Sequence, residues 1–413
     1  ISKLMSQMTL EEKIGQLNLP VSNIFVSGER KDGQLSPLEQ RIAGGELGGL
    51  FGLKGAKQIR EMQKIAVEKS RLHIPLLFGL DVIHGYETTF PIPLALSTSW
   101  NMELIELEAR VSATEAGNDG INWVFSPMVD ICRDARWGRI AEGPGEDPYL
   151  GAEIAKALVR GYQGRNNDFS VENTVMACVK HYALYGASEA GRDYNTVDMS
   201  RQRMMNEYML PYKAASEQGA GSFMASFNEF EGIPVTANKY LLNDVLRKQW
   251  GFGGFIVSDY TGVSEMVNHG IGDLQTVSAR ALDAGIDMDM VSEGFASTLG
   301  KSLAEGKITV AHIDQACRKI LEAKYKLGLF SDPYKFCDEE RSARELFSLT
   351  NRAVSKEIAD ESQVLLKNDN KLLPLKKSGR IAVIGPLGDA ASDMPGCWSL
   401  TGKAGESVSL YQG

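Results

Sequence analysis

Residues 254–263 read GFIVSDYTGV, and this stretch points to the fold. Residues 255–258 form a short, mostly apolar run with the length of a buried strand, and a carboxylate, Asp259, follows it directly. In parallel α/β folds the carboxyl end of a strand leaves the core, and binding sites are built there. A second interpretation is a helix cap, because Asp259 precedes a predicted helix at 262–266 and Asp is a common N-cap residue. The stretch alone leaves both interpretations open.

Similar apolar runs alternate with helical patterns over the first 330 residues. The predicted strands are 47–53, 75–82, 123–129, 175–181, 222–227, 254–258 and 286–290. The predicted helices are 58–72, 102–116, 152–163, 201–218, 240–248 and 311–326. Such alternation predicts βαβ units and a parallel sheet. Seven or eight units within about 300 residues fit a (β/α)8 TIM-like barrel better than an open sheet.

The character of the sequence changes after the barrel. We expect a catalytic barrel over residues 1–330, a linker with a connecting helix over 331–370, and the beginning of a second domain over 371–413. Residues 380–385 (RIAVIG) have the pattern of a first strand. The sequence therefore predicts an α/β barrel followed by an incomplete α/β sandwich domain.

Charge and composition narrow the class of protein. The 413 residues carry 44 basic and 53 acidic side chains, a net charge of −9, without long blocks of one sign. This pattern argues against nucleic acid as a partner and suits a neutral ligand. No apolar run approaches the roughly 20 residues of a membrane-spanning helix. The first 17 residues form an amphipathic helical pattern, with a capping box at Thr9 and Glu12, rather than a secretory leader.

The sequence gives no support for a metal or another cofactor. The five cysteines are scattered without a CxxC pair, and the five histidines include no HExxH or HxH motif. Disulfide frameworks, zinc ribbons and zinc-centred hydrolysis all need such spacings. We therefore expect a mechanism that uses protein side chains alone.

Polar residues recur where the predicted strands end. These residues are Asp81 and His84 after the second strand, Arg136, Arg139, Glu142, Glu146 and Asp147 after the third, Lys180 and His181 after the fourth, and Met224 and Asn228 after the fifth. Each has a structural alternative: an aspartate pairs with an arginine, a histidine is satisfied in the core, and an arginine braces the loop at 142–147. In a barrel the strand ends converge on one face, so the group as a whole predicts a pocket.

The chemistry that fits this pocket is sugar recognition. Pyranose hydroxyls both donate and accept hydrogen bonds, and charged side chains such as those of Asp81, Arg139 and Lys180 can satisfy them. Aromatic residues such as Tyr260 or Trp137 could cover the apolar side of the ring. We expect Asp259 to attack the anomeric carbon, with nearby cations holding it ionised.

Four motifs support this interpretation: FGLDVIHG, RDARWGRIAEGPGEDP, VKHYALYGASEAGRDYN and FIVSDYTG. Together with TLEEKIGQL near the start, they resemble glycoside hydrolase family 3, in particular its bacterial periplasmic β-glucosidase branch. The resemblance implies a retaining, exo-acting β-glucosidase that hydrolyses terminal non-reducing β-D-glucosyl residues. It also implies Asp259 as the nucleophile and a sugar site formed by Asp81, Arg139, Lys180, His181 and Met224. Tyr260 stands where many relatives have tryptophan, at the outer edge of the pocket.

A second carboxyl group is missing from the motifs. Retaining hydrolysis needs one about 5–5.5 Å from the nucleophile, to protonate the leaving oxygen and later to activate water. In most of the family a glutamate of the second domain provides this carboxyl group, and it lies beyond the residues present here. The β-N-acetylglucosaminidase branch uses a histidine in a KHFPGHG…DSH-type loop, which the loop after His181 lacks. We expect Glu189 and Asp193, in that loop, to contact ligand or to brace the loop.

Several alternatives stay open. The chain could be a β-xylosidase or another exo-glycosidase of the same family, or a catalytically impaired sugar-binding fragment. A phosphate-binding barrel finds weak support in SEGFAST at 292–298. For partners we expect a small carbohydrate, such as a β-glucoside or gluco-oligosaccharide, with a homodimer or pairing with the remainder of the second domain left open. The family branch implies a periplasmic or secreted protein whose leader is not in this sequence.

Overall fold

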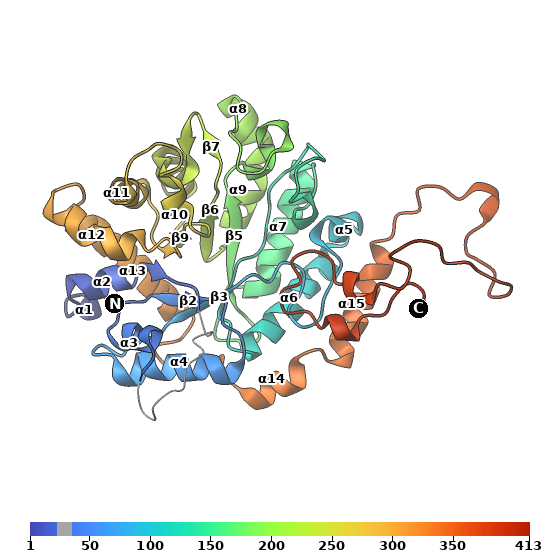
Figure 1. Cartoon of the computed structure of the whole chain (residues 1–413), viewed down its shortest axis with the longest axis horizontal. Coiled ribbons are helices and arrows are strands. Elements are labelled where there is room, and N and C mark those ends of the chain that lie inside the picture. Colours follow the sequence, from blue (N-terminus) through green and yellow to red (C-terminus); the bar gives the residue numbers. More distant parts are fainter. Residues whose placement is uncertain (23–34) are drawn as a thin grey trace.

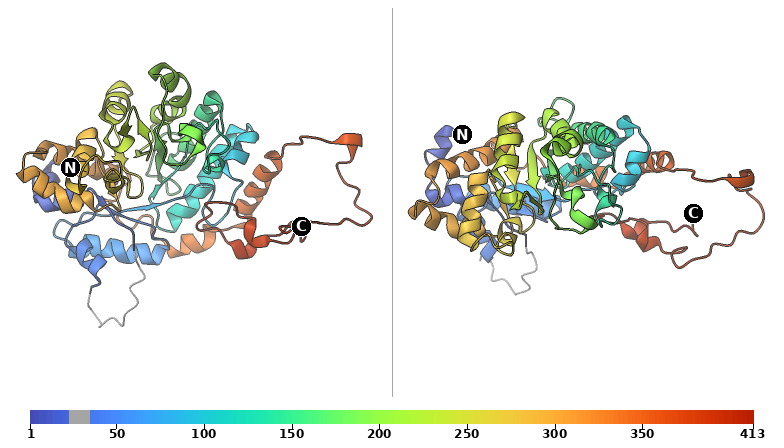
Figure 2. Two further views of the ribbon diagram at one scale, coloured as in Figure 1. Left: turned by 45° about the horizontal axis from the view of Figure 1, so that its top comes forward. Right: turned by 90° about the horizontal axis from the view of Figure 1, so that it is seen from above.

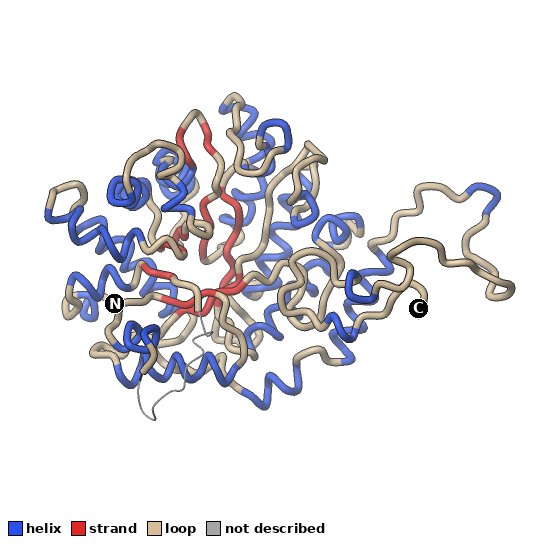
Figure 3. Tube along the Cα trace, viewed as in Figure 1, coloured by secondary structure: helices blue, strands red, loops and turns tan. Residues whose placement is uncertain are grey.

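Eight short parallel strands form a closed ring in the computed structural model, which describes residues 1–22 and 35–413 (Figures 1 and 3). Six of them pair in the order β2 (Gly49–Phe51), β3 (Leu77–Leu80), β4 (Trp123–Val124), β5 (Met176–Tyr182), β6 (Ser222–Ala225) and β9 (Phe255–Val257). The other two, β1 (Asn18–Leu19) and β10 (Asp289–Met290), pair with each other. Parallel bridges at Val21–Phe51 and Val257–Met288 join this pair to both edges of the six. The predicted (β/α)8 barrel is confirmed.

Helices cover the outside of the ring (Figure 2). The main ones are α3 (Pro37–Ala43), α4 (Ala56–Lys69), α6 (Met102–Asn118), α7 (Pro148–Gln163), α9 (Leu210–Glu217), a π-helical segment at Tyr240–Gln249, α11 (Leu274–Ala284), α12 (Gly294–Ala304) and α13 (Val310–Lys326). Shorter elements are α1 (Ser2–Met5), α2 (Leu10–Gly15), α5 (Pro93–Thr98), α8 (Arg201–Arg203), α10 (Gly262–Glu265) and the hairpin of β7 (Glu229–Phe230) and β8 (Ile233–Pro234). This arrangement leaves the carboxyl ends of the strands free to form a site.

Local sequence signals set where several helices begin. At α2, Thr9 and Glu12 form the predicted capping box. At α7, Asp147 accepts a hydrogen bond from the backbone N–H of Leu150 at 2.7 Å, and Pro148 follows as the first helical residue. Asp147 is therefore a helix cap rather than a site residue.

The strand β1 was not predicted from the sequence. It has only two residues, Asn18 and Leu19, directly after the helical pattern of the N-terminus. Its partner in register, Asp289, is far away in the chain, so no local pattern reveals the pairing. This strand is the one that closes the barrel.

Two helices after the barrel, α14 (Glu339–Glu345) and α15 (Leu349–Glu361), pack against α6. The buried carboxylate of Glu115 accepts hydrogen bonds from the backbone N–H groups of Thr88 and Phe347 and from the Asn351 amide, at 2.8, 2.9 and 2.8 Å. Glu115 therefore connects the barrel loop at 88 to the start of α15.

Residues 363–413 extend away from the barrel and then return to it (Figure 2). The strand predicted at 380–385 is wrong for this structure, because these residues form no strand and Ile384 is 90% exposed. A strand needs a neighbour for its backbone hydrogen bonds, and none of the described residues pairs with this segment. The return is fixed by Cys397, whose carbonyl accepts a hydrogen bond from His84 Nε2 at 2.5 Å, and by Lys403, which pairs with Glu87.

Candidate active site

Asp259 lies at the mouth of the barrel, two residues after β9 ends. Its side chain is largely buried, and Oδ1 accepts a hydrogen bond from the backbone N–H of Tyr260 at 2.7 Å. The following helix, α10, has Thr261 as its N-cap residue and receives no side-chain cap. The helix-cap interpretation of Asp259 is therefore wrong, and the carboxylate remains available to the pocket.

Side chains from two other strands meet Asp259. Lys180, at the end of β5, donates to Asp81 Oδ1 at 2.6 Å and so links β5 to the end of β3. The next residue, His181, places Nε2 at 3.6 Å from Asp259 Oδ2. The structure thus brings together four of the residues predicted for the site, Asp81, Lys180, His181 and Asp259, with β4 lying between β3 and β5.

Two residues that sequence reasoning missed hold His181 in place. Asp130 Oδ2 accepts from both the backbone N–H and Nδ1 of His181, at 2.8 and 3.0 Å. Tyr212 Oη lies 2.5 Å from Asp130 Oδ1 and 2.8 Å from the His181 carbonyl oxygen. Since Nδ1 carries the proton that Asp130 accepts, neutral His181 presents the lone pair of Nε2 to Asp259. Asp130 directly follows the apolar run 123–129, the same signal that singled out Asp259.

The two arginines of the third loop have different roles. Arg139 forms a bidentate pair with Glu142, at 2.7 and 2.9 Å, and its guanidinium carbon lies 5.6 Å from the ring centroids of both Tyr185 and Trp398. Arg136 instead pairs with Asp134 on the surface. Arg139 is therefore the arginine that faces the pocket, and Glu142 orients it.

Burial and charge act in opposite directions on the nucleophile candidate. Burial raises the pKa of the Asp259 carboxyl to about 7, while Lys180 and Arg139 act to lower it. The expectation that these cations hold Asp259 ionised is therefore only partly met, because burial outweighs them. Burial together with Arg139 and Lys180 also lowers the pKa of His181 well below its usual range, so this imidazole is neutral at pH 7.

Several buried polar atoms around Asp259 have no hydrogen-bond partner in the described part of the chain. They include Asp259 Oδ2 and His181 Nε2. Buried polar atoms are almost always hydrogen-bonded, so their grouping indicates a place for a polar ligand. These two acceptor atoms lie near the cations of Lys180 and Arg139, and together they suit the hydroxyl groups of a polyhydroxylated molecule.

The other predicted site residues lie around this group. Met224, on β6, packs in the hydrophobic core. Tyr260 is 47% exposed at the mouth and contacts Phe51 edge-on. Asp193 accepts a hydrogen bond from Trp137 Nε1 at 3.0 Å, as expected of a residue that braces its loop.

Comparisons with known proteins point to one family. Residues 9–323 match the glycosyl hydrolase family 3 N terminal domain, and residues 363–413 match the glycosyl hydrolase family 3 C-terminal domain. The chain is 43% identical to the periplasmic beta-glucosidase of Salmonella typhimurium, over 100% of this chain and 53% of that protein. It is 36% identical to a beta-xylosidase of Formosa agariphila, over 84% of this chain and 51% of that protein.

Solved structures give the same result. The beta-glucosidase from Listeria innocua in complex with glucose has a TM-score of 0.93 and 39% identity, over 100% of this chain and 57% of that chain. The exo-1,3/1,4-beta-glucanase from Pseudoalteromonas has a TM-score of 0.86 at 29% identity. The chain spans about half the length of the curated relatives it matches. With both domain matches in order along the sequence, the chain belongs to glycoside hydrolase family 3.

Proposed function

We propose that this chain carries the catalytic barrel of an exo-acting, retaining β-glucosidase, with Asp259 as the nucleophile. The observation that carries the proposal is the pair of buried, unpartnered atoms Asp259 Oδ2 and His181 Nε2, 3.6 Å apart at the strand ends. A terminal β-D-glucosyl unit would supply hydroxyls to these atoms and to Lys180, Asp81 and Arg139. Similarity to beta-glucosidases of Salmonella and Listeria supports the choice of sugar.

The proposed reaction has two displacements. Ionised Asp259 attacks the anomeric carbon, a bond forms between Oδ2 and that carbon, and the bond from the carbon to the glycosidic oxygen breaks with its electron pair leaving on oxygen. Water then attacks the same carbon and releases Asp259 and glucose with retained configuration. Because the Asp259 pKa is about 7, the attacking form gains population as the pH rises through neutrality.

The proton for the leaving oxygen needs a second carboxyl group. Asp81 is the carboxylate whose charge acts on Asp259, and it is already paired with Lys180. Among the described residues the contacts of Asp259 include no free carboxyl group suited to that role. We propose that a glutamate outside this sequence provides it, as the family resemblance implies.

A β-xylosidase is the second candidate, and it is favoured by the Formosa relative. The two sugars differ at the C5 substituent, so the ratio of rates with matched aryl glucoside and aryl xyloside separates the functions.

The proposal further places the protein in the periplasm or outside the cell, and divides it into a barrel over 1–330, a linker over 331–370 and a partial domain over 371–413. No helix in the described part of the chain is both long and apolar enough to cross a bilayer.

The test uses 2,4-dinitrophenyl 2-deoxy-2-fluoro-β-D-glucoside, read by intact mass and peptide mapping. Its leaving group departs without a proton, so the first displacement does not depend on the second carboxyl group. We expect one stable adduct, on the peptide that contains Asp259. The variant Asp259→Asn should form none, while Asp193→Asn should still form it. A folded wild-type chain without an adduct, or an adduct elsewhere, would overturn the proposal.

A further inference from the structure

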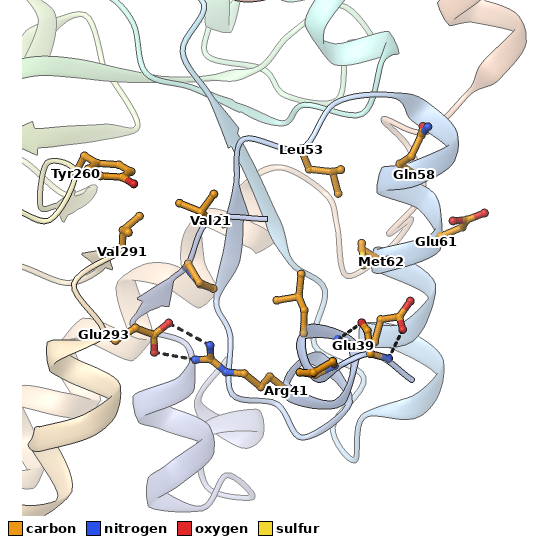
Figure 4. Close-up of a pocket in the computed structure, with 14 residues that line it drawn as sticks. Val21, Glu39, Arg41, Leu53, Gln58, Glu61, Met62, Tyr260, Val291 and Glu293 are labelled. Atoms are coloured by element: carbon orange, nitrogen blue, oxygen red, sulfur yellow. Dashed lines mark hydrogen bonds and ion pairs between the residues drawn. The ribbon is translucent and has the colours of Figure 1, made fainter. Parts of the chain in front are cut away.

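The two carboxylate oxygens of Asp259 have different surroundings. Oδ1 accepts a hydrogen bond from the backbone N–H of Tyr260 at 2.7 Å, while the Tyr260 ring borders a separate cavity with Val21 and Val291 (Figure 4). Oδ2 is buried without a hydrogen-bond partner in the described part of the chain, and His181 Nε2 lies 3.6 Å from it. The state of Nε2 therefore decides whether Oδ2 faces a donor or a lone pair.

That state depends on which ring nitrogen of His181 carries the proton. A neutral imidazole has one N–H, so a proton on Nδ1 leaves a lone pair on Nε2, and a proton on Nε2 makes that atom a donor. Burial together with Arg139 and Lys180 lowers the pKa of His181 well below its usual range, so the doubly protonated ring is not populated at pH 7. Because the ring is fully buried, the protein groups at its two nitrogens select the tautomer.

Asp130 is the residue at Nδ1, and its carboxylate is fixed in orientation. Its Oδ2 lies 2.8 Å from the backbone N of His181 and 3.0 Å from Nδ1. The backbone N–H can only donate, so Oδ2 has to be an acceptor. On the other side, the Tyr212 hydroxyl lies 2.5 Å from Oδ1. A lone pair on Nδ1 would face a second lone pair on Oδ2, whereas an N–H completes a hydrogen bond.

Asp130 supplies no proton of its own at neutral pH. Burial raises the pKa of its carboxyl to about 6, so the carboxylate is the main form at pH 7. The proton between Asp130 and His181 therefore belongs to Nδ1.

We propose that Asp130 is a positioning residue for the nucleophile: by holding the His181 proton on Nδ1, it prevents Nε2 from donating to Asp259 Oδ2. A donor at this place would stabilise the ionised carboxylate before the reaction, and attack on carbon would then have to overcome that stabilisation. The part of the inference that concerns attack rests on the proposed function, whereas the tautomer of His181 does not depend on it.

Two substitutions separate the acceptor of Asp130 from its charge. Asp130→Asn keeps the acceptor, because the amide oxygen has to face the His181 N–H. Its NH2 group then meets the Tyr212 hydroxyl, which can accept and still donate to the His181 carbonyl oxygen 2.8 Å away. Asp130→Ala removes the same charge and also the acceptor. The proton should then move to Nε2, where the Asp259 carboxylate accepts it in a charge-assisted hydrogen bond.

The matched control is Tyr212→Phe. It removes a hydrogen bond from the same buried group and leaves the acceptor at Nδ1 in place. Any effect of loosening this part of the core should therefore appear in Tyr212→Phe as well, while an effect of the tautomer should not.

The first test reads the tautomer by ¹⁵N NMR of the whole chain labelled at its histidine rings, with His181→Gln for assignment. We expect the proton on Nδ1 in the wild type, Asp130→Asn and Tyr212→Phe, and on Nε2 in Asp130→Ala. A proton on Nε2 in the wild type would overturn the inference without any variant, so the test does not depend on how well Asp130→Ala folds.

The second test follows the rate of adduct formation with 2,4-dinitrophenyl 2-deoxy-2-fluoro-β-D-glucoside as the pH changes. The wild-type rate should rise with a midpoint near pH 7, as Asp259 ionises. In Asp130→Ala the new donor favours the ionised form, so the midpoint should fall by about one pH unit, while Asp130→Asn and Tyr212→Phe should stay within about 0.3 unit of the wild type.

The other titratable or charged groups that face Asp259 and His181 are common to all these variants. They are Asp81, Arg139 with its partner Glu142, Cys178, Lys180, Tyr185 and Tyr194. A difference between Asp130→Ala and Asp130→Asn therefore reports the acceptor at Nδ1 alone.

Equal midpoints in Asp130→Ala and Asp130→Asn would overturn the role of Asp130 toward Asp259. No adduct at any pH in a folded wild type with its proton on Nδ1 would instead overturn the proposed function, and with it the role toward a nucleophile, while the tautomer assignment would stand.

Discussion

Burial raises the pKa of the Asp259 carboxyl to about 7, even though Lys180 and Arg139 favour its ionised form. In the unfolded chain the same carboxyl titrates near pH 4. Between these two values the folded state keeps a proton that the unfolded state loses, so the free energy of unfolding falls as the pH rises. The loss begins near pH 4 and is complete above pH 7.

This linkage predicts that Asp259→Asn stabilises the protein in a pH-dependent way. The amide has the same shape and cannot ionise, so it escapes the penalty that the buried carboxylate meets at high pH. We expect the melting temperature of the variant to exceed that of the wild type by roughly 2–5 °C at pH 8 and by less than about 1 °C at pH 4.5. Differential scanning calorimetry across this range is the measurement.

The matched control is Asp244→Asn, which removes an exposed carboxylate paired with Lys248. It should change the melting temperature by less than about 1 °C at either pH. A gain in Asp259→Asn that is equal at both pH values would contradict the linkage, because it would reflect packing rather than ionisation.

The sequence pointed to the side chains that gather at the barrel mouth better than to the residues that support them. Asp259, Lys180 and His181 each follow an apolar run, and the barrel brings such positions together. Asp130 gives the same signal, but the long loop after it drew attention to its arginines instead. Tyr212 lies inside α9, where nothing in the local pattern distinguishes a tyrosine that reaches a buried carboxylate from one that fills the core.

Among the helices, α6 joins the barrel to the segment that follows it. Both carboxylate oxygens of Glu115 are buried acceptors, with Thr88 on the barrel side and Phe347 and Asn351 on the side of α15. One turn later, Asp119 accepts from the backbone N–H groups of Gly55 and Ala56, which start α4. The end of α6 thus serves as a fixed acceptor for three elements.

Glu115→Ala should release α15 without unfolding the barrel. Alanine removes both acceptor oxygens, so the buried donors of Thr88, Phe347 and Asn351 lose their partner, at a cost of about 3 kcal/mol. We expect a lower melting temperature and new cleavage after Phe347, between α14 and α15, read by mass spectrometry after limited chymotrypsin digestion. Glu103→Ala, at the exposed start of the same helix, is the control and should give the wild-type pattern. Protection of the α14–α15 link in Glu115→Ala would show that helix packing alone holds this segment.

Long helices were easier to predict than short or unpaired strands. α6, α7 and α13 lie close to the predicted ranges, because an apolar stripe repeated over four turns is a strong local signal. β1 has only two residues and pairs with a strand some 270 positions away, so no local sequence pattern predicts it. Residues 380–385 have a strand pattern without a neighbour, which shows that pattern alone does not form a sheet.

At the scale of the whole molecule, the proposed nucleophile Asp259 lacks a proton donor among its described contacts. About half the length of the relatives is represented here, and residues 363–413 expose large apolar side chains such as Leu366 and Ile384. In a folded domain such side chains would be covered. We therefore expect this chain to perform the first displacement only with leaving groups that need no proton, and to hydrolyse the glucosyl intermediate slowly.

Added azide tests this expectation directly. Azide is a strong nucleophile that needs no general base, so it can replace water in the second displacement when the second carboxyl group is absent. With 2,4-dinitrophenyl β-D-glucoside as substrate, we expect steady-state turnover to rise at least about tenfold at molar-range azide, with β-D-glucosyl azide as the product by NMR. Chloride at equal ionic strength should give no increase. Rapid hydrolysis of cellobiose by the chain alone, with no effect of azide, would mean that the proton donor is already within these residues.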